Sequence, residues 1–157
     1  MNRLNYQNGS LDLADARILK ILSENARTST AEIGRRIGLS SPSTAERVRR
    51  LEEAGVIRGY RADIDPQALG YAASAWLSIR PVPGELARVA ALLQDIPEIT
   101  QCERVTGEDC FLAKVHVREV TDLETVIDRI IPYAMTRTSV IQSVKVEQRL
   151  PPVIPDD

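Results

Sequence analysis

The chain has 157 residues, 43% of them hydrophobic and 27% charged, with a net charge of −2 at pH 7. This length suits one large domain or two small ones with a packed core. The first residues are polar, unlike a signal peptide, and no apolar segment approaches the ~20 residues needed to cross a bilayer, so we expect a soluble, cytoplasmic protein without a membrane partner.

Helix signals come first along the chain. Asp12 is a suitable N-cap for a helix from Leu13 to about Asn25. Ser29 followed by Glu32 is a capping-box pattern that predicts the start of a second helix. Gly38 is suited to end that helix, because glycine tolerates a positive φ.

A third helix is predicted after a tight turn. Ser40 or Ser41 caps it, Pro42 lies in its first turn, and Gly55 ends it. The expected buried side has four residues, Ala45, Val48, Leu51 and Ala54. The two helices around this turn indicate a helix-turn-helix, whose second helix is suited to a DNA major groove.

The charge around the third helix favours binding to double-stranded DNA. Between residues 35 and 61 the sequence has seven arginines and three acids, and this excess can neutralise phosphates. Arg47 and Arg50 are suited to guanine edges or to phosphates, and the hydroxyl side chains to shorter contacts. The predicted DNA-binding residues are Arg35, Ser40, Ser41, Ser43, Thr44, Arg47 and Arg50.

The chain then changes in composition. Residues 56–65 contain short extended pieces, either a small wing or a linker strand, and Pro66 and Gly70 bracket a turn. The net charge is +2 over residues 1–66 and −4 over residues 67–157. We therefore expect a helix-turn-helix domain over residues 1–65 and a second domain with different partners over residues 66–157.

The second domain alternates strand and helix patterns. Thr121 and Glu124 form a capping-box pattern at the start of its second helix. The expected order is β-α-β-β-α-β, a ferredoxin-like fold, so the whole protein is of the α+β class. The elements are expected at residues 71–80, 85–95, 98–105, 110–117, 121–131 and 138–150.

The first strand of this domain indicates self-association. Ala75, Leu77 and Ile79 alternate with Trp76 and small residues, so neither face is charged. A sheet covered by helices on one side normally has a polar second face. We therefore expect a second sheet, most simply that of another subunit, against Trp76. A partly exposed face with one stray tryptophan is the alternative.

Signals for catalysis or metal binding are weak. Cys102 and Cys110 match neither a disulfide framework nor a zinc pattern and are expected as buried thiols. His116 lies in an alternating strand pattern and is expected as a surface residue. The sequence has no glycine-rich phosphate loop and no metal-ligand cluster. We expect no enzyme activity, no metal and no cofactor.

Six short segments occur in a specific order and spacing: LDLAD at residues 11–15, GLS at 38–40, RVRRLE at 47–52, GVIRGY at 55–60, VTGE at 105–108 and TRTS at 136–139. Together they resemble the Lrp/AsnC (feast/famine) family of prokaryotic transcription regulators, over nearly the whole chain. The resemblance implies a DNA-binding homodimer, often assembled to an octamer. Its second domains pair through their sheets and sense a small molecule, typically an amino acid.

The resemblance also implies an effector pocket between second domains, near the hairpin loop and the approach to the last strand. The matching residues are Thr106, Gly107, Glu108, Asp109, Thr136, Arg137, Thr138 and Ser139. Carboxylates suit an α-ammonium group, and an arginine with hydroxyls suits an α-carboxylate. The chain departs from the family at Cys110, where many members carry Asp, and at Ala134, where many carry Gly. The pocket therefore differs or binds nothing, and a plain polar turn is the alternative.

Two other functions stay open. An amino-acid-sensing module that binds another protein, without DNA, would show a neutral or acidic face on the third helix. RNA binding through the sheet needs exposed aromatic side chains on central strands, and Trp76 alone is a candidate.

Overall fold

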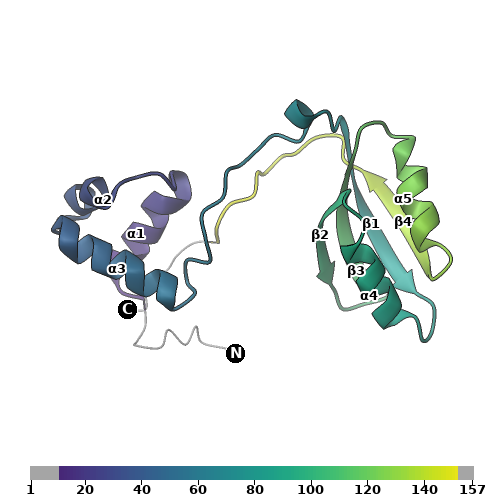
Figure 1. Ribbon diagram of the computed structural model, residues 1–157, viewed down its shortest axis with the longest axis horizontal. Helices are drawn as coiled ribbons and strands as arrows, with labels where there is room; N and C mark the ends of the chain where they lie inside the picture. The colour runs from purple at the N-terminus through teal and green to yellow at the C-terminus, as the bar shows by residue number, and fades with distance from the viewer. Residues whose placement is uncertain (1–10, 152–157) are drawn as a thin grey trace. The chain divides into compact units, whose positions relative to one another are not determined.

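The computed structural model describes residues 11–151, which form two compact units (Figure 1). The first unit contains the chain up to Asp63 together with the returning segment from Val146, and the second runs from Ile64 to Lys145. The division lies slightly before the expected boundary, and the returning segment belongs with the first unit instead of the second. The polar N-terminus on which the signal-peptide argument rests lies outside the described residues.

Three helices build the first unit: α1 (Leu13–Glu24), α2 (Thr30–Ile37) and α3 (Ser41–Glu53). Asp12 caps α1 as predicted, since its carboxylate accepts from the Asp15 amide at 2.8 Å. Gly38 ends α2 with a φ of 78°, also as predicted. The helices meet around Ile18, Ile33 and Leu51, each at most 1% exposed.

The start of α2 forms only half of the predicted capping box. Ser29 Oγ accepts from the Glu32 amide at 3.2 Å. The Glu32 carboxylate instead accepts from the guanidinium groups of Arg35 and Arg36, because these charged donors on the same helix bind it more strongly than a backbone amide.

The buried side of α3 agrees with the prediction at Val48, Leu51 and Ala54, which lie in or against the core, and differs at Ala45. Thr44 and Leu51 are fully buried, whereas Ala45 is exposed. The cause is a close approach of α2 at Gly34. A Cβ there would lie 2.6 Å from the Leu39 carbonyl oxygen and 2.9 Å from Thr44 Oγ1. The missing side chain of Gly34 therefore sets which side of α3 faces inward.

An ion cluster ties α3 to α1. Arg47 Nη1 donates to Asp12 Oδ2 at 2.7 Å and to Asp15 Oδ1 at 2.8 Å. The Asp15 side chain is 1% exposed, and a buried carboxylate needs such a partner. Burial raises the pKa of Asp12, but hydrogen bonds from the Asp15 amide and from Arg47 outweigh burial and leave that pKa below its usual value.

The segment after α3 forms no strand. The amides of Val56 and Ile57 both donate to the Leu51 carbonyl oxygen, so the chain leaves α3 in a turn. Residues 56–65 then contain neither helix nor strand, and the expected wing or linker strand is not formed because no second strand lies beside it. A short 3-10 helix, η1 (Gln67–Leu69), precedes the second unit's sheet.

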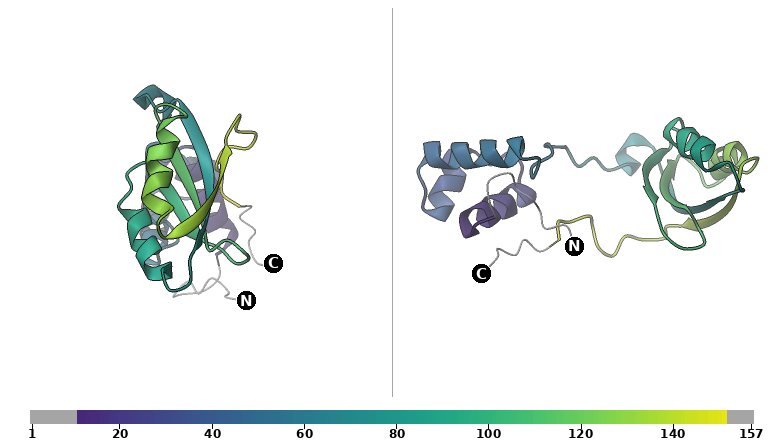
Figure 2. Two further views of the ribbon diagram at one scale, coloured as in Figure 1. Left: turned by 90° about the vertical axis from the view of Figure 1, so that its right-hand side faces the viewer. Right: turned by 90° about the horizontal axis from the view of Figure 1, so that it is seen from below.

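The second unit has the predicted β-α-β-β-α-β order. Its four strands are antiparallel, in the spatial order β2-β3-β1-β4, and α4 and α5 cover one face (Figure 2). Ala75, Leu77 and Ile79 point into the core beneath the helices, and Trp76 lies on the other face, as predicted. The elements are β1 (Ala73–Pro81), α4 (Leu86–Gln94), β2 (Ile99–Arg104), β3 (Phe111–Val117), α5 (Asp122–Ile130) and β4 (Ala134–Val140).

Two boundaries in this unit differ from the prediction. Thr121 makes no side-chain cap, because it already has helical φ and ψ of −63° and −27° whereas a capping residue is extended. The last strand begins and ends earlier than the expected 138–150. Strand β4 pairs only with β1, from Ala134 opposite Pro81 to Val140 opposite Ala75, so its length is set by its partner.

His116 and the two cysteines also differ from the prediction. His116 is 9% exposed, and its Nδ1 lies 2.8 Å from Ser74 Oγ on the paired strand. Burial and the nearby Lys114 lower the pKa of His116, so the ring is neutral at pH 7. Cys102 is exposed rather than buried, since its edge strand has no outer neighbour. Cys110 is partly buried.

None of the described helices is both long and apolar enough to span a bilayer. Within residues 11–151, no cluster of three His, Cys, Asp or Glu side chains is placed to hold a metal ion.

The ion cluster predicts a stability loss for Arg47→Ala. Removing the arginine leaves the buried Asp15 with Arg50, 4.0 Å away, as its remaining cationic partner. Breaking a fully buried pair costs roughly 3–5 kcal/mol, and the cost here is smaller because Arg47 is 25% exposed and Arg50 remains. The pKa of Asp12 is lower in the folded state than in the unfolded chain. The cluster therefore stabilises the folded state fully at pH values above the pKa of Asp12 in the unfolded chain. The difference from wild type is therefore expected at neutral pH and shrinks below about pH 4.

Thermal unfolding at several pH values measures this effect. Arg49→Ala is the matched control, because Arg49 pairs only with exposed carboxylates and surface pairs contribute about 0–1 kcal/mol. Equal melting temperatures for Arg47→Ala and wild type at pH 7 contradict the assignment.

Candidate nucleic-acid interface and effector region

The outward face of α3 begins with small uncharged side chains. The exposed residues of α3 are Ser41, Pro42, Ser43, Ala45, Glu46, Arg49, Glu52 and Glu53. Ser40 is the N-cap, and its Oγ accepts from the Ser43 amide at 3.3 Å. Serine hydroxyls can contact base edges or phosphates, and an alanine methyl can contact a thymine methyl. Pro42 and Ala45 were not among the predicted residues, because Pro42 was expected only to start the helix and Ala45 was expected on its buried side.

Thr44 is not available to DNA, contrary to the prediction. Its side chain is fully buried, and its hydroxyl donates to the Ser40 carbonyl oxygen at 3.0 Å. The contact with Gly34 described above encloses it. Thr44 therefore supports the turn between the two helices and does not contact a ligand.

The two arginines predicted to reach DNA are partly engaged inside the unit. Arg47 is bound to Asp12 and Asp15, so its role in base reading is corrected to a structural one. Arg50 is 41% exposed and lies 4.0 Å from Asp15, and no acceptor among the described residues reaches its buried Nε. Arg50 therefore remains a candidate for contact with DNA, and Arg47 does not.

Surface ion pairs moderate the charge of the helix-turn-helix. Arg35 is 74% exposed and donates to both Glu32 oxygens, at 2.9 and 2.7 Å. Hydrogen bonds from Arg35 and Arg36 lower the pKa of Glu32 to about 2. Arg49 pairs in the same way with two glutamates of α3. Exposed pairs of this kind are weak, so DNA phosphates can replace the carboxylates.

Two exposed arginines follow α3 directly and were not assigned as site residues. Arg58 and Arg61 belong to no ion pair recorded within residues 11–151. The backbone before Arg58 is fixed by the turn onto Leu51, and Tyr60 donates to Glu52 at 2.8 Å. Burial and the Glu52 carboxylate raise the pKa of Tyr60 to about 12, which preserves this bond at neutral pH. The sequence did contain a signal for Arg58 and Arg61, because both belong to the excess of arginines over acids between residues 35 and 61.

The second unit brings together two of the predicted effector residues. Arg137 Nη2 on β4 donates to Asp109 Oδ2 in the hairpin loop at 2.9 Å. Thr106, Gly107 and Glu108 lie exposed in the same loop, and Gly107 has a φ of 115° that glycine adopts readily.

The other predicted residues on β4 are divided between the two faces of the sheet. Thr136 and Thr138 pair opposite Ile79 and Leu77 and share their helix-covered face. Arg137 and Ser139 lie on the open face, because successive side chains of a strand alternate. The four residues therefore cannot surround one ligand within a single chain, and the pocket between second domains stays a prediction.

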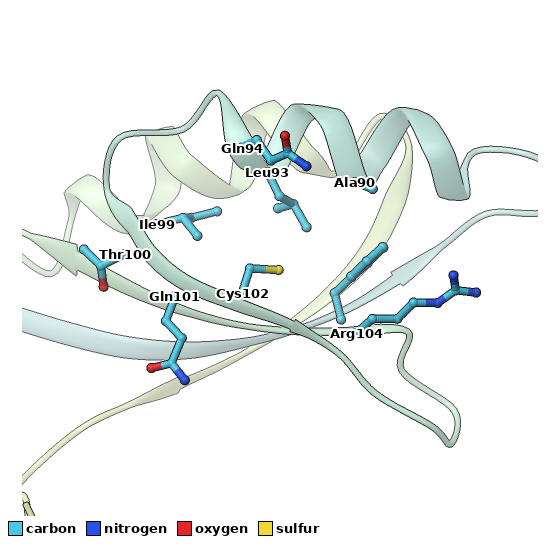
Figure 3. A pocket seen from close by; sticks show the side chains of 9 residues that line it. Ala90, Leu93, Gln94, Ile99, Thr100, Gln101, Cys102 and Arg104 are labelled. Atoms are coloured by element: carbon cyan, nitrogen blue, oxygen red, sulfur yellow. The ribbon is translucent and has the colours of Figure 1, made fainter. Parts of the chain in front are cut away.

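The larger cavity in this unit lies elsewhere, between α4 and the edge strand β2 (Figure 3). It has a volume of about 410 Å³ and a mainly uncharged lining, with Leu93, Ile99 and Cys102 among its residues. Partial desolvation by the cavity walls, with Glu103 nearby, raises the pKa of the otherwise exposed Cys102, so its thiol is protonated at neutral pH and a poor nucleophile. None of the predicted effector residues lines this cavity.

Both units match known families. Residues 11–58 match a winged helix-turn-helix DNA-binding family, and residues 74–151 match the Lrp/AsnC ligand-binding domain.

Individual relatives match along most of the chain. The transcriptional regulator LrpC of Bacillus subtilis is 35% identical over 133 residues, which are 85% of this chain and 92% of the relative. LrpA of Mycobacterium tuberculosis is 36% identical over 132 residues, 83% of this chain and 88% of the relative.

Solved structures agree. The structure of B. subtilis LrpC superposes with a TM-score of 0.84 at 34% identity, covering 89% of this chain and 100% of that one. A feast or famine regulatory protein from M. tuberculosis, complexed with L-methionine, gives a TM-score of 0.85 at 33% identity, covering 92% and 100%. With its helix-turn-helix unit, its half-covered β-α-β-β-α-β sheet and these matches, the chain belongs to the Lrp/AsnC family of transcriptional regulators.

Proposed function

We propose that this protein is a homodimeric transcriptional regulator that binds specific DNA sequences through α3 and responds to an amino acid. The exposed N-terminal half of α3 carries the proposal, because in helix-turn-helix proteins this part of the second helix contacts base edges in the major groove. Ser41, Ser43 and Ala45 occupy that place.

Phosphate contacts come from arginines around this face. Arg58 and Arg61 are exposed and unpaired in the described part of the chain, and Arg35 is held only by a weak surface pair. A dimer places two copies of α3 about one DNA turn apart, ~34 Å, so the operator is expected to be nearly palindromic.

The open face of the sheet supports self-association. Trp76, Leu112 and Met135 lie on the face away from the helices, as the strand pairing requires. Met135 is 69% exposed, and the other two side chains are partly exposed. We assign these apolar side chains, which share their face of the sheet with Lys114 and Arg137, to packing against the sheet of a second copy, which buries them.

The pair of Asp109 and Arg137 is the effector site that we propose. Their side chains are 28% and 74% exposed, so their ion pair is weak and a ligand can separate it. The Arg137 guanidinium then binds an α-carboxylate, and Asp109 with Glu108 binds the α-ammonium group. Two similar structures, from M. tuberculosis and Neisseria meningitidis, are complexes with L-methionine, which supports an amino acid as the effector.

DNA reading by α3 predicts two different phenotypes for arginine variants. Arg49→Ala is expected to weaken binding to the selected operator by about 1–3 kcal/mol if the guanidinium reads a base. Arg58→Ala is expected to weaken binding to all sequences and to reduce the salt slope by about 1. Fluorescence anisotropy on operators selected from genomic DNA measures both, with Arg104→Ala on β2 as the control. Affinities equal to wild type in both variants, or no DNA binding by wild type at low salt, contradict the proposal and favour a protein-binding module.

Self-association through the open face predicts a monomeric variant. Met135→Glu places a charge in the apolar surface and is expected to give the mass of a single chain by light scattering at micromolar concentration. Ile131→Glu is the control, because Ile131 is 52% exposed at the end of α5 and not on this face. A dimeric Met135→Glu, or a monomeric wild type, refutes the interface.

The effector assignment predicts the loss of an amino-acid response. In wild type, L-methionine or another of the common amino acids is expected to change operator affinity, and Arg137→Gln is expected to abolish this change because the carboxylate loses its partner. Glu103→Gln, an exposed carboxylate on strand β2 at the opposite edge of the sheet, serves as the control. An unaltered response in Arg137→Gln argues against the site.

A further inference from the structure

A second cavity in the sheet unit lies away from the hairpin loop, where β3 ends and α5 begins. Its volume is about 260 Å³, and its floor consists of Val117 and Val126, which are 2% and 3% exposed. Tyr71 and the hydroxyl of Thr125 also line it. The cavity is smaller than the ~300–1,000 Å³ typical of drug-sized ligands, so it suits a molecule of a few carbon atoms.

Four charged side chains surround this cavity without neutralising one another. Arg118, Arg129, Glu98 and Asp122 all line it, yet in the described part of the chain no ion pair within 4.0 Å joins any of them. Arg129 donates only to the Asp95 carbonyl oxygen, at 3.3 Å, and Asp122 accepts from a backbone amide. Two positive and two negative groups are thus held apart around an open space.

We propose that this cavity binds a small α-amino acid as a zwitterion, at a site distinct from the hairpin. The net charge of the lining is zero, which matches a ligand that carries one charge of each sign. The guanidinium of Arg118, with that of Arg129, binds the α-carboxylate. Glu98 binds the α-ammonium group, and an aliphatic side chain rests on Val117 and Val126.

Occupancy of this cavity acts on the segment through which the chain enters the unit. The Arg118 guanidinium lies 5.7 Å from the centroid of the Tyr71 ring, and its Nη1 would lie 3.3 Å from a Cβ on Gly70. The Tyr71 amide donates to the Pro66 carbonyl oxygen at 3.0 Å, which closes the turn around η1. A carboxylate that draws Arg118 away from Tyr71 therefore changes the packing of residues 66–71.

Calorimetric titration of the full chain tests the site. The starting protein is Arg137→Gln, which removes the proposed anion partner at the hairpin, and the probes are the twenty common amino acids. For the tightest ligand, its amide and its α-keto acid are then titrated, since each lacks one of the two charges. We expect binding of at least one amino acid, and at least tenfold weaker binding of both analogues.

Two further variants locate the binding. Arg118→Gln and Glu98→Gln, each added to Arg137→Gln, are expected to weaken binding at least tenfold, and Arg104→Gln is expected to leave it unchanged. Thermal melts confirm that each variant folds, and amide NMR is expected to show shifts at Tyr71 and Thr125 on ligand addition. The absence of binding to Arg137→Gln overturns the proposal, as does unchanged affinity in both folded variants.

The result of this titration can be distinguished from the outcome of the tests of the proposed function. Operator binding is measured without amino acids, so its failure in wild type refutes the DNA-binding proposal and leaves the calorimetry unaffected. If the effector proposal at the hairpin fails because methionine does not change operator affinity, amino-acid binding to the Arg137→Gln protein is still measured as an independent result.

Discussion

The buried carboxylate of Asp15 governs how α3 is held. It belongs to the capping box that starts α1, and it also receives Arg47 from α3. A carboxylate that is 1% exposed is stable only when it is fully paired, so these two helices are fixed to each other at this point. The close approach of Gly34 to Thr44 fixes α2 on the other side. Together these contacts decide which residues of α3 remain for DNA.

The second unit depends on a difference between the two faces of its sheet. Both helices cover one face of the sheet, and the buried side chains of β1 and β3 belong to that face. The other face keeps Trp76 and Met135 partly or largely exposed. A sheet with helices on one side and apolar residues on the other is complete only when a second layer covers it. The dimer proposed above and the fold of the unit thus have the same origin.

Signals that act over a few residues were readable from the sequence. Asp12 caps a helix, Gly38 ends one, and the strand and helix order of the second unit follows from short-range patterns. The families that matched residues 11–58 and 74–151 agree with the motifs that carried the resemblance. In these cases the determining contacts lie within one helical turn or one strand.

Features that depend on distant partners were not readable. The inward side of α3 was assigned to Ala45 instead of Thr44, because helical periodicity alone tolerates such a rotation and Gly34 decides it from another helix. Arg47 is bound to a carboxylate 32 positions away. The end of β4 is set by the length of β1, and His116 is buried beside Ser74 of the paired strand, which its own alternating pattern does not indicate.

The arginines of this chain show why a local charge count is an incomplete guide to a binding surface. Arg47 is internal to the first unit, Arg35 and Arg49 are neutralised by glutamates on their own helices, and Arg58 has no carboxylate recorded beside it. An arginine side chain in this chain therefore stabilises the fold, forms a weak surface ion pair, or is free to bind a phosphate. Within the described residues, position relative to a carboxylate decides among these roles. The proposed effector pair of Asp109 and Arg137 follows the same rule, because a weak, partly exposed pair is available to a ligand, whereas a buried one is not.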